Sequence, residues 1–306
     1  MRVLVVGAGA VGGFFGARLI ESGADVTFLV RNGRRRQLAT DGIRIANLDG
    51  TVAAVRAKVV SADDLHSTFD LILLAVKGTA LDAAAADVAP AVGEETAILP
   101  LLNGILHIDV LEHRFGPGRV LGGVGLVATE LEPDGLIRQL APAASITFGE
   151  LDGTITPRVS AIQATFATAA FESRVSDTIV QEMWEKWFFM AAGGTATVLL
   201  GGPAGTILTV DDGPALIGQV IEEAAAVVAA EGHPVREAAR AQVAGALTTP
   251  GSSFATSLYR DFAAGRRTEV EPILGDLLQR AVTRGVPAPL LGAATVRLRV
   301  HDAATG

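Results

Sequence analysis

The sequence predicts an α/β protein with a doubly wound parallel sheet in its N-terminal domain and a second, all-helical domain. The first observation is a glycine-rich stretch, Gly7–Gly12, that lies between an apolar run and a helical pattern. The second is a pair of continuous apolar runs, Phe69–Val76 and Thr96–Leu102, which are typical of strands buried on both faces of a parallel sheet. The third is that the last part of the chain shows helical patterns and no further buried strand. We therefore expect two domains, residues 1–172 and 173–306.

The glycine-rich stretch has the spacing of a Rossmann-type dinucleotide-binding motif. An apolar run, Val3–Val6, leads into Gly7-Ala8-Gly9-Ala10-Val11-Gly12, and a second strand is expected at Asp25–Val30. In this motif the first glycine makes a tight turn, the second lets a pyrophosphate approach the backbone, and the third lets the helix pack on the sheet. A secretory signal peptide is excluded, because Arg18 and Glu21 occupy regular helical positions where a cleavage site would lie.

The residue after the second strand favours NADP over NAD. In NAD-binding proteins an acidic residue about 20 positions past the glycines accepts hydrogen bonds from the ribose hydroxyls. This chain has Arg31 there, and a guanidinium can pair with a 2′-phosphate through two parallel hydrogen bonds. Arg34, Arg35 and Arg36 add positive potential, but a run of arginines is more often a solvated face, so we assign them no role. We expect NADP(H) as the cofactor.

Composition excludes several classes of protein. The chain has 306 residues, of which 49% are hydrophobic, enough to bury two cores. A formal net charge of −8 argues against nucleic acid as a partner. The absence of cysteine excludes disulfides and thiolate chemistry and fits a cytoplasmic enzyme, while the five histidines lack metal-ligand spacing. We expect no metal site.

The stretch from Trp187 to Val210 has no charged residue and is long enough to span a bilayer. Its Gly201-Gly202-Pro203 cluster should end a helix after about Leu200. A buried helix followed by a turn therefore explains the stretch better than a membrane span.

The remaining elements follow from hydrophobic periodicity and turn residues. Expected strands are Ile43–Ala46 and Val52–Val60 as a hairpin, Gly122–Ala128, Ile137–Leu140 and Ser145–Gly149. Expected helices are Leu81–Ala89, Val159–Ala170, Asp177–Leu200, Pro214–Glu231, Pro234–Ala244, Ser257–Ala264 and Glu269–Arg284.

Polar residues in apolar surroundings are the candidate functional groups. Lys77 and Asn103 follow the two buried strands, at the sheet edge where open α/β sheets bind ligands. Lys186 lies in a helix rich in tryptophan and phenylalanine, as either a surface lysine or a desolvated proton donor. Ser257 and Glu269 lie at expected helix starts, where capping is the alternative to a functional role.

With these residues together, the chain resembles the ketopantoate reductase (2-dehydropantoate 2-reductase) family, which is similar to 6-phosphogluconate dehydrogenase-like enzymes. The matching residues are Gly7 to Gly12, Arg31, Ala75-Val76-Lys77, Asn103-Gly104, Ala128, Trp184-Glu185-Lys186, Ser257 and Thr268-Glu269. The resemblance implies that NADP(H) contacts Gly7, Ala8, Gly9, Ala10, Val11, Gly12, Arg31, Lys77, Asn103, Ala128 and Glu269. It also implies that Lys186 is the proton donor, that Ser257 contacts substrate, and that Glu269 holds the lysine or the nicotinamide ribose.

The substrate side departs from the family pattern. Where the family has asparagines after its catalytic lysine, this chain has Met190, Gly194 and Ala204, and a further polar position is Phe254. Each lost hydrogen bond to a substrate can cost about 1 to 3 kcal/mol of binding. The substitutions therefore indicate a different, more apolar substrate, with Met190 and Gly194 among the substrate-binding positions.

Three hypotheses about function follow from these residues. The first is an NADPH-dependent reductase of a 2-oxo acid, nominally 2-dehydropantoate to (R)-pantoate in pantothenate and coenzyme A biosynthesis, with Lys186 protonating the oxyanion. In that case Thr195, Ser253 or Ser257 should supply the missing contacts. The second is a paralogous reductase of a more apolar ketone. The third is a non-catalytic NADP-binding regulator, which would need no proton donor. We expect a small-molecule substrate and no nucleic acid or membrane partner, and a homodimer is left open.

Overall fold

The chain begins with the predicted β-α-β arrangement. In the computed structural model, which describes residues 1–305, β1 (Arg2–Val6) is followed by α1 (Ala10–Glu21) and β2 (Asp25–Leu29). The first strand is buried along almost its whole length, because it is the central strand of a parallel sheet.

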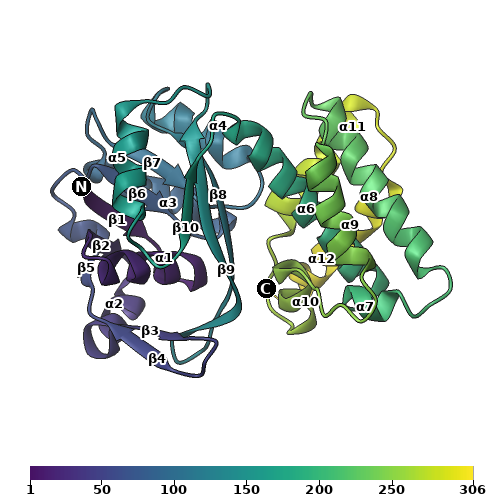
Figure 1. The fold of residues 1–306 in the computed structure, drawn as a ribbon, viewed down its shortest axis with the longest axis horizontal. Coiled ribbons are helices and arrows are strands. Elements are labelled where there is room, and N and C mark those ends of the chain that lie inside the picture. Colours follow the sequence, from purple (N-terminus) through teal and green to yellow (C-terminus); the bar gives the residue numbers. More distant parts are fainter. Residues whose placement is uncertain (306) are drawn as a thin grey trace. The chain divides into compact units, whose positions relative to one another are not determined.

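That sheet contains five parallel strands in the order β5-β2-β1-β6-β7 (Figure 1). Besides β1 and β2 it contains β5 (Lys58–Val60), β6 (Leu71–Leu74) and β7 (Ala97–Pro100). The order reverses at β1, as in a doubly wound Rossmann sheet. The predicted fold class is therefore confirmed: a parallel α/β domain is followed by a helical one.

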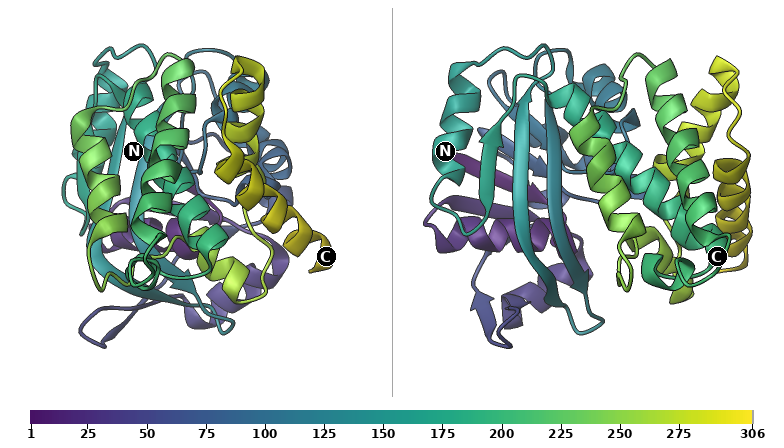
Figure 2. Two further views of the ribbon diagram at one scale, coloured as in Figure 1. Left: turned by 90° about the vertical axis from the view of Figure 1, so that its right-hand side faces the viewer. Right: turned by 45° about the vertical axis from the view of Figure 1, so that its right-hand side comes forward.

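A second sheet packs on the other side of α1. It consists of β3 (Ile43–Ala46), β4 (Val52–Val55), β8 (Leu121–Leu131), β9 (Leu136–Glu150) and β10 (Glu172–Val175). The long β8 and β9 form an antiparallel hairpin (Figure 2). Helix α1 has glycines at both contacts, because a Cβ at Gly13 would lie 2.4 Å from Ile137 and one at Gly16 would lie 2.3 Å from Phe28.

Two expectations about strands are corrected, and one strand was not expected. The expected strand Val52–Val60 is two strands, since β4 pairs with β3 whereas β5 pairs with β2 in the other sheet. The expected strands Ile137–Leu140 and Ser145–Gly149 are parts of the single strand β9. Strand β10 was not predicted, because it is an edge strand whose residues alternate between exposed and half-buried.

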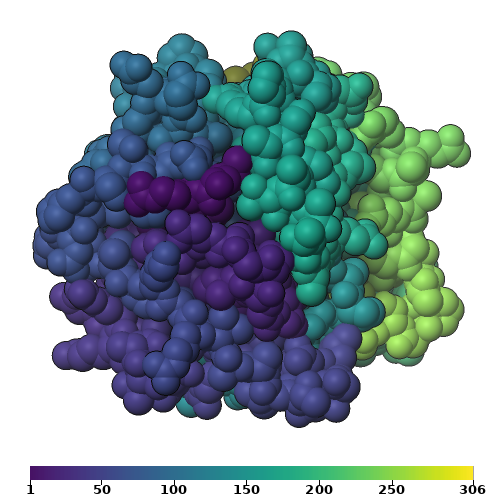
Figure 3. All heavy atoms as spheres, turned by 60° about the vertical axis from the view of Figure 1, so that its left-hand side comes forward, coloured from purple at the N-terminus to yellow at the C-terminus, as the bar shows by residue number. Residues whose placement is uncertain are grey.

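Four helices complete this first unit: α2 (Asn32–Asp41), α3 (Leu81–Val88), α4 (Leu106–Phe115) and α5 (Pro157–Phe166). Short 3₁₀ turns lie at Ala62–Asp64, Gly78–Ala80 and Ala89–Ala91. Met1 is exposed, and Thr165 of α5 donates a hydrogen bond to its sulfur. The start of the chain, in dark purple, lies at the surface of this unit (Figure 3). Helix α2 buries only Leu38, which is why no apolar periodicity predicted it.

The chain divides into two compact units. The first contains residues 1–102 and 107–180, and it continues past residue 172 because β10 pairs with β9. The second contains the segment Asn103–Leu106 and the chain from Gln181 onward. The short segment contacts Glu269 and Pro272 of the second unit.

The second unit is helical. Its elements are α6 (Ile179–Leu200), α7 (Ala204–Ile207), α8 (Gly213–Ala230), α9 (Glu237–Thr248), α10 (Ser257–Ala263), a π-helical turn (Glu271–Gly275), α11 (Asp276–Arg284) and α12 (Pro289–Ala304). Residues 191–198 of α6 are all buried, so this helix is the core of the unit. The helix ends at Leu200, before the glycines, so the charge-free stretch is a buried helix followed by a turn. By length and composition α8 alone among the described helices could cross a membrane, but 44% of it is buried inside the structure.

Candidate active site

The glycine turn after β1 has the geometry that the motif requires. Gly7 has a φ of +94°, which favours glycine, and a Cβ there would lie 3.1 Å from the carbonyl oxygen of Ala75. A Cβ on Gly12 would lie 2.1 Å from the carbonyl oxygen of Gly7, so only glycine lets α1 start this close to the turn. A Cβ on Gly9 would meet no atom within 4 Å. The open side of the turn is therefore at Gly9, where the first N–H groups of α1 suit a pyrophosphate.

The carboxyl ends of β1, β2 and β6 are neighbours. The Gly7 N–H donates to the carbonyl of Leu29 at the end of β2, and the Ala75 N–H donates to Val6. Arg31, one position before α2, is exposed and precedes the first turn of that helix. Lys77 is exposed beyond the end of β6. Of the residues predicted at this edge, the first unit thus contains the glycine turn, Arg31 and Lys77.

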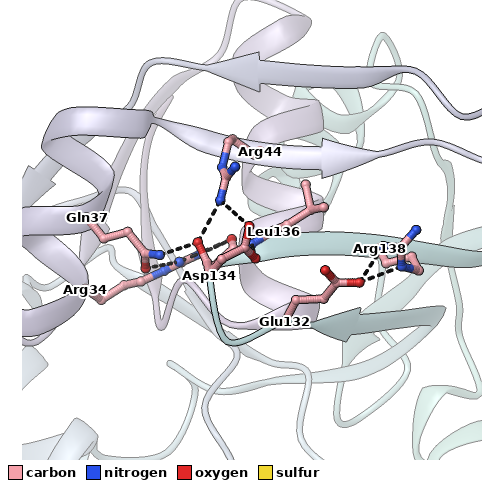
Figure 4. A network of polar contacts seen from close by, with 8 residues as sticks. Arg34, Gln37, Arg44, Glu132, Asp134, Leu136 and Arg138 are labelled. Carbon is pink, nitrogen blue, oxygen red and sulfur yellow. Dashed lines mark hydrogen bonds and ion pairs between the residues drawn. The ribbon is translucent and has the colours of Figure 1, made fainter.

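Arg34 links the glycine turn to the β8–β9 hairpin, a role that the sequence did not indicate. Its Nε donates to the carbonyl oxygen of Ala8 at 3.0 Å. Its two terminal nitrogens each lie 3.3 Å from the carbonyl oxygen of Gly135, between Asp134 and Leu136 of the hairpin turn (Figure 4). Gln37 and Arg44 bind the neighbouring Asp134. Burial lowers the pKa of Arg34, with a smaller effect from Arg44. The run of arginines is therefore not uniformly a solvated face.

Ala128 lies where the β8–β9 pairing is interrupted. Val127 pairs with Ala144 and Thr129 pairs with Gln139, so the register shifts at Ala128. The Thr129 hydroxyl donates to the carbonyl of Ala10 in the first turn of α1. The irregularity therefore lies beside the helix start that follows the glycine turn.

In the second unit, Lys186 and Glu269 form an electrostatic pair. Lys186 is half-buried on α6, and burial lowers its pKa to about 8, while the Glu269 carboxylate acts in the opposite direction. The Asn103 side-chain amide donates to Glu269 Oε2 at 3.3 Å. Asn103 follows the carboxyl end of β7 and groups with Glu269 in the second unit. A desolvated lysine with a pKa near 8 is suited to giving up a proton near neutral pH.

Of the positions that differ from the family pattern, Met190 and Gly194 are on α6, whereas Ala204 begins α7. A Cβ on Gly194 would lie 3.0 Å from Leu258 and 3.8 Å from Leu274. The Ala204 N–H donates to the carbonyl oxygen of Phe254, and Ala204 is fully buried. Two leucine side chains thus border Gly194, together with the Thr256 hydroxyl at 3.9 Å. Met190 is half-buried one turn before Gly194.

The aromatic ring of Phe254 is a neighbour of the same helix. A Cβ on Gly193 would lie 3.1 Å from this ring, which also packs edge-to-face on Phe189 at 5.4 Å between centroids. Lys186 and Gly193 are seven residues apart, so they lie on nearly the same face of α6. The sequence signalled Phe254 as a substitution, but it gave no sign that Phe189 and Gly193 would be its partners.

The hydroxyl groups near this region have different environments. Thr256, rather than Ser257, caps α10, because its side chain accepts from the Tyr259 N–H. Ser257 is half-buried at the first position of α10, and Ser253 is exposed. Thr195 is nine residues from Lys186, about 180° around α6. Its buried hydroxyl has no hydrogen-bond partner among residues 1–305, but it lies on the opposite face from the lysine.

No group of three or more His, Asp or Glu side chains in residues 1–305 could hold a metal ion.

Comparison with known proteins covers nearly the whole chain. The family model "Ketopantoate reductase PanE/ApbA" matches residues 3–153, and "Ketopantoate reductase PanE/ApbA C terminal" matches residues 178–302. An uncharacterized oxidoreductase of Bacillus subtilis (strain 168), YkpB, is 33% identical over 303 residues, 99% of each chain. A 2-dehydropantoate 2-reductase of Halobacterium salinarum is 29% identical over 99% of this chain and 100% of its own length.

A solved structure has the same fold. The crystal structure of a PanE/ApbA family ketopantoate reductase from Ralstonia eutropha JMP134 superposes with a TM-score of 0.88 at 25% identity. The match covers 100% of this chain and 99% of that chain. The likeness therefore includes both units.

Proposed function

Because the chain belongs to the ketopantoate reductase family and is an oxidoreductase, we propose that it reduces the ketone of a 2-oxo acid with NADPH. The nominal reaction is 2-dehydropantoate to (R)-pantoate. The observation that carries the proposal is Lys186, a half-buried lysine on the core helix whose charge interacts with Glu269. A non-catalytic NADP-binding regulator would not need this pair.

The first unit would hold the cofactor, which supplies the hydride when bound. Three observations support this: the open space at Gly9, the positive φ of Gly7 and the exposed guanidinium of Arg31 at the start of α2. The N–H groups at the start of α1 would bind the pyrophosphate. Arg31 would pair with the 2′-phosphate and Lys77 would add positive charge. The backbone at Ala128 and the side chains of Asn103 and Glu269 are further proposed contacts.

In the second unit, the Lys186 ammonium would bind the ketone oxygen and protonate it. As the carbonyl carbon accepts the hydride, its oxygen gains negative charge, and the nearby cation stabilises that charge. The oxygen takes a proton from Nζ to become the hydroxyl, and the neutral amine regains a proton from solvent. With a pKa of about 8, about nine-tenths of the lysine is charged at pH 7. Glu269 favours the charged form, and Ser257 would contact the substrate.

A panel of 2-oxo acids assayed with NADPH and with NADH tests this function. We expect turnover of at least one 2-oxo acid, with NADPH oxidised and the 2-hydroxy acid formed in equal amounts. The panel should include 2-dehydropantoate and acids with linear, branched and aromatic side chains. Binding of NADPH without turnover of any member would instead favour the regulator.

A second candidate, a reductase of a more apolar 2-oxo acid, is favoured by Phe254 and Leu258. Leu258 packs against Gly194, a position where the family pattern has asparagine, and Phe254 itself stands where that pattern has a polar residue. Without such amides, the hydroxyl of a polar substrate has no hydrogen-bond partner in the site. An apolar analogue then leaves no polar group of the site unpaired, so the site does not discriminate against it. 2-Dehydropantoate should then be a poor substrate.

Met190→Asn distinguishes the two candidates. Position 190 already has a half-buried side chain, whereas an asparagine at 194 would have to displace Leu258. We expect Met190→Asn to raise kcat/KM for 2-dehydropantoate by about tenfold, the value of one added hydrogen bond. Met190→Leu is the control, because it changes shape without adding an amide. Efficient reduction of 2-dehydropantoate by the wild type, above about 10⁴ M⁻¹s⁻¹, would reject the apolar candidate.

The proposed setting is the cytoplasm, which the cysteine-free sequence fits. Sedimentation of the purified protein tests whether the chain forms a homodimer.

A further inference from the structure

The helix that follows Glu269 begins with an irregular turn. Residues Glu271–Gly275 form a π-helical turn that continues directly into α11. Pro272 in this turn has no N–H to donate. A π turn contains an additional residue and changes where its carbonyl groups point, and such turns are frequent at functional sites.

Two parts of the second unit use this turn. The indole N–H of Trp187 donates to the carbonyl oxygen of Ile273 at 2.8 Å, in a buried position. Gly104, with a φ of +75°, approaches the carbonyl of Pro272 so closely that a Cβ would lie 2.3 Å from its oxygen. Asn103, the preceding residue, donates to Glu269. The turn therefore contacts the residue after Lys186 and the residue after Asn103, which is a hydrogen-bond partner of Glu269.

Trp187 immediately follows Lys186 and is only 1% exposed. An indole N–H can only donate, so when buried it needs an acceptor, and Ile273 is that acceptor. The Arg280 guanidinium of α11 lies 5.5 Å from the centre of the same ring. A fixed indole restricts both rotation and sliding of this part of α6 relative to the turn.

We propose that Trp187 is a positioning residue that sets the spacing between the Lys186 ammonium and the Glu269 carboxylate through its hydrogen bond to Ile273. The turn begins two residues after Glu269, and Trp187 is the residue after Lys186, so one hydrogen bond joins the two short segments. The proposal rests on the catalytic role proposed for Lys186.

Several other charged groups near this part of α6 have ion-pair partners of their own. Glu185 is paired with Arg236, which donates through its side chain and its backbone N–H. Arg280 is paired with Glu231 and Asp276. Glu269 is the carboxylate whose charge acts on Lys186. The coupling between Lys186 and Glu269 is therefore the quantity that a shift of the turn should change.

The coupling can be measured without any substrate. The chain has three lysines, Lys58, Lys77 and Lys186, so lysine labelled with ¹³C at Cε gives three resonances whose pH midpoints report on the amines. Glu269→Gln removes the charge that raises the pKa of Lys186. We expect it to lower the Lys186 midpoint by at least about half a unit, roughly a threefold change in proton affinity.

In a Trp187→Phe background, Glu269→Gln should shift the Lys186 midpoint by less than half as much. Trp184→Phe is the matched control, because Trp184 is also buried on α6 but stacks on His233. We expect the full shift in that background. An equal shift with and without Trp187 would overturn the proposal.

An isosteric replacement separates the hydrogen bond from packing and keeps the test valid if Trp187→Phe does not fold. The chain has two tryptophans, so in Trp184→Phe a tryptophan analogue enters only position 187. Benzothienylalanine keeps the ring shape and replaces the N–H with sulfur. We expect it to reduce the coupling and to lower kcat about tenfold, with the Kd of NADPH unchanged. Unchanged coupling would reject the role of the bond, whereas full activity of Lys186→Ala would reject the proposed function instead.

Discussion

Arg31 is the residue on which the proposed cofactor preference depends. It is exposed at the start of α2, where a guanidinium and the helix N-terminus can both meet a phosphate. We expect Arg31→Ala to weaken NADPH binding by about 10- to 100-fold, the value of charge-assisted hydrogen bonds, and to leave NADH binding unchanged. Titration calorimetry with both cofactors measures this.

The control is Arg36→Ala, which removes another exposed arginine from the same helix. If Arg36→Ala weakened NADPH binding as much as Arg31→Ala, general positive potential would explain the preference. Equal affinity of the wild type for NADPH and NADH would show that no arginine selects the cofactor.

Lys186 should give the reaction a characteristic pH dependence. Burial lowers its pKa to about 8, so the ammonium is present below that pH and is lost above it. We expect kcat/KM for ketone reduction to be flat below about pH 8 and to fall about tenfold per unit well above it. Oxidation of the 2-hydroxy acid needs the neutral amine and should show the opposite trend. A reduction rate that is unchanged to pH 10 would contradict the role of Lys186 as donor.

For single residues, the sequence was informative where only one residue type allows the local structure. The glycine spacing predicted the turn because Gly7 needs a positive φ and Gly12 needs the absence of a Cβ. The hydrogen-bond partners of a side chain could not be predicted in the same way. Neither the bond from Arg34 to Ala8 nor the bond from Trp187 to Ile273 has a local signal, because the partners are distant in the chain.

Among the elements, α2 and the β8–β9 hairpin are joined through Arg34 (Figure 4). Its bond to the Ala8 carbonyl fixes the glycine turn itself, so removing it should affect every dinucleotide. We expect Arg34→Ala to weaken NADPH and NADH binding by a similar factor of about 3 to 30, in contrast to the selective effect of Arg31→Ala. Affinities should be compared at a temperature where circular dichroism shows both variants folded. A loss confined to NADPH would mean that Arg34 acts on the 2′-phosphate instead.

Elements with a continuous apolar run or a clear helical period were predictable. Strands β6 and β7 and helices α6 and α8 are of this kind. Strand β10 and helix α2 could not be predicted in this way. The residues of β10 alternate only between exposed and half-buried, and α2 is mostly polar. The π turn could not be predicted either, because its sequence is compatible with an ordinary helix start that contains a proline.

For the whole molecule, the chain contains two units with different chemistry. The first contains the glycine turn and Arg31, and the second contains Lys186, Glu269 and Asn103. The site roles of these residues stay predictions, and the bond from Asn103 to Glu269 had no signal in the sequence because the two residues are distant in the chain. The proposal assigns cofactor binding mainly to the first unit and proton transfer to the second.

This division leads to the most direct test, which is to measure NADPH affinity and single-turnover hydride transfer on the same preparation of Lys186→Ala. The substrate is the best 2-oxo acid of the wild-type panel. The account predicts an NADPH Kd within about twofold of the wild type and a hydride-transfer rate lower by about 10²- to 10⁴-fold, the contribution typical of a general acid. A variant that transfers hydride at the wild-type rate would contradict the central claim that Lys186 is the proton donor.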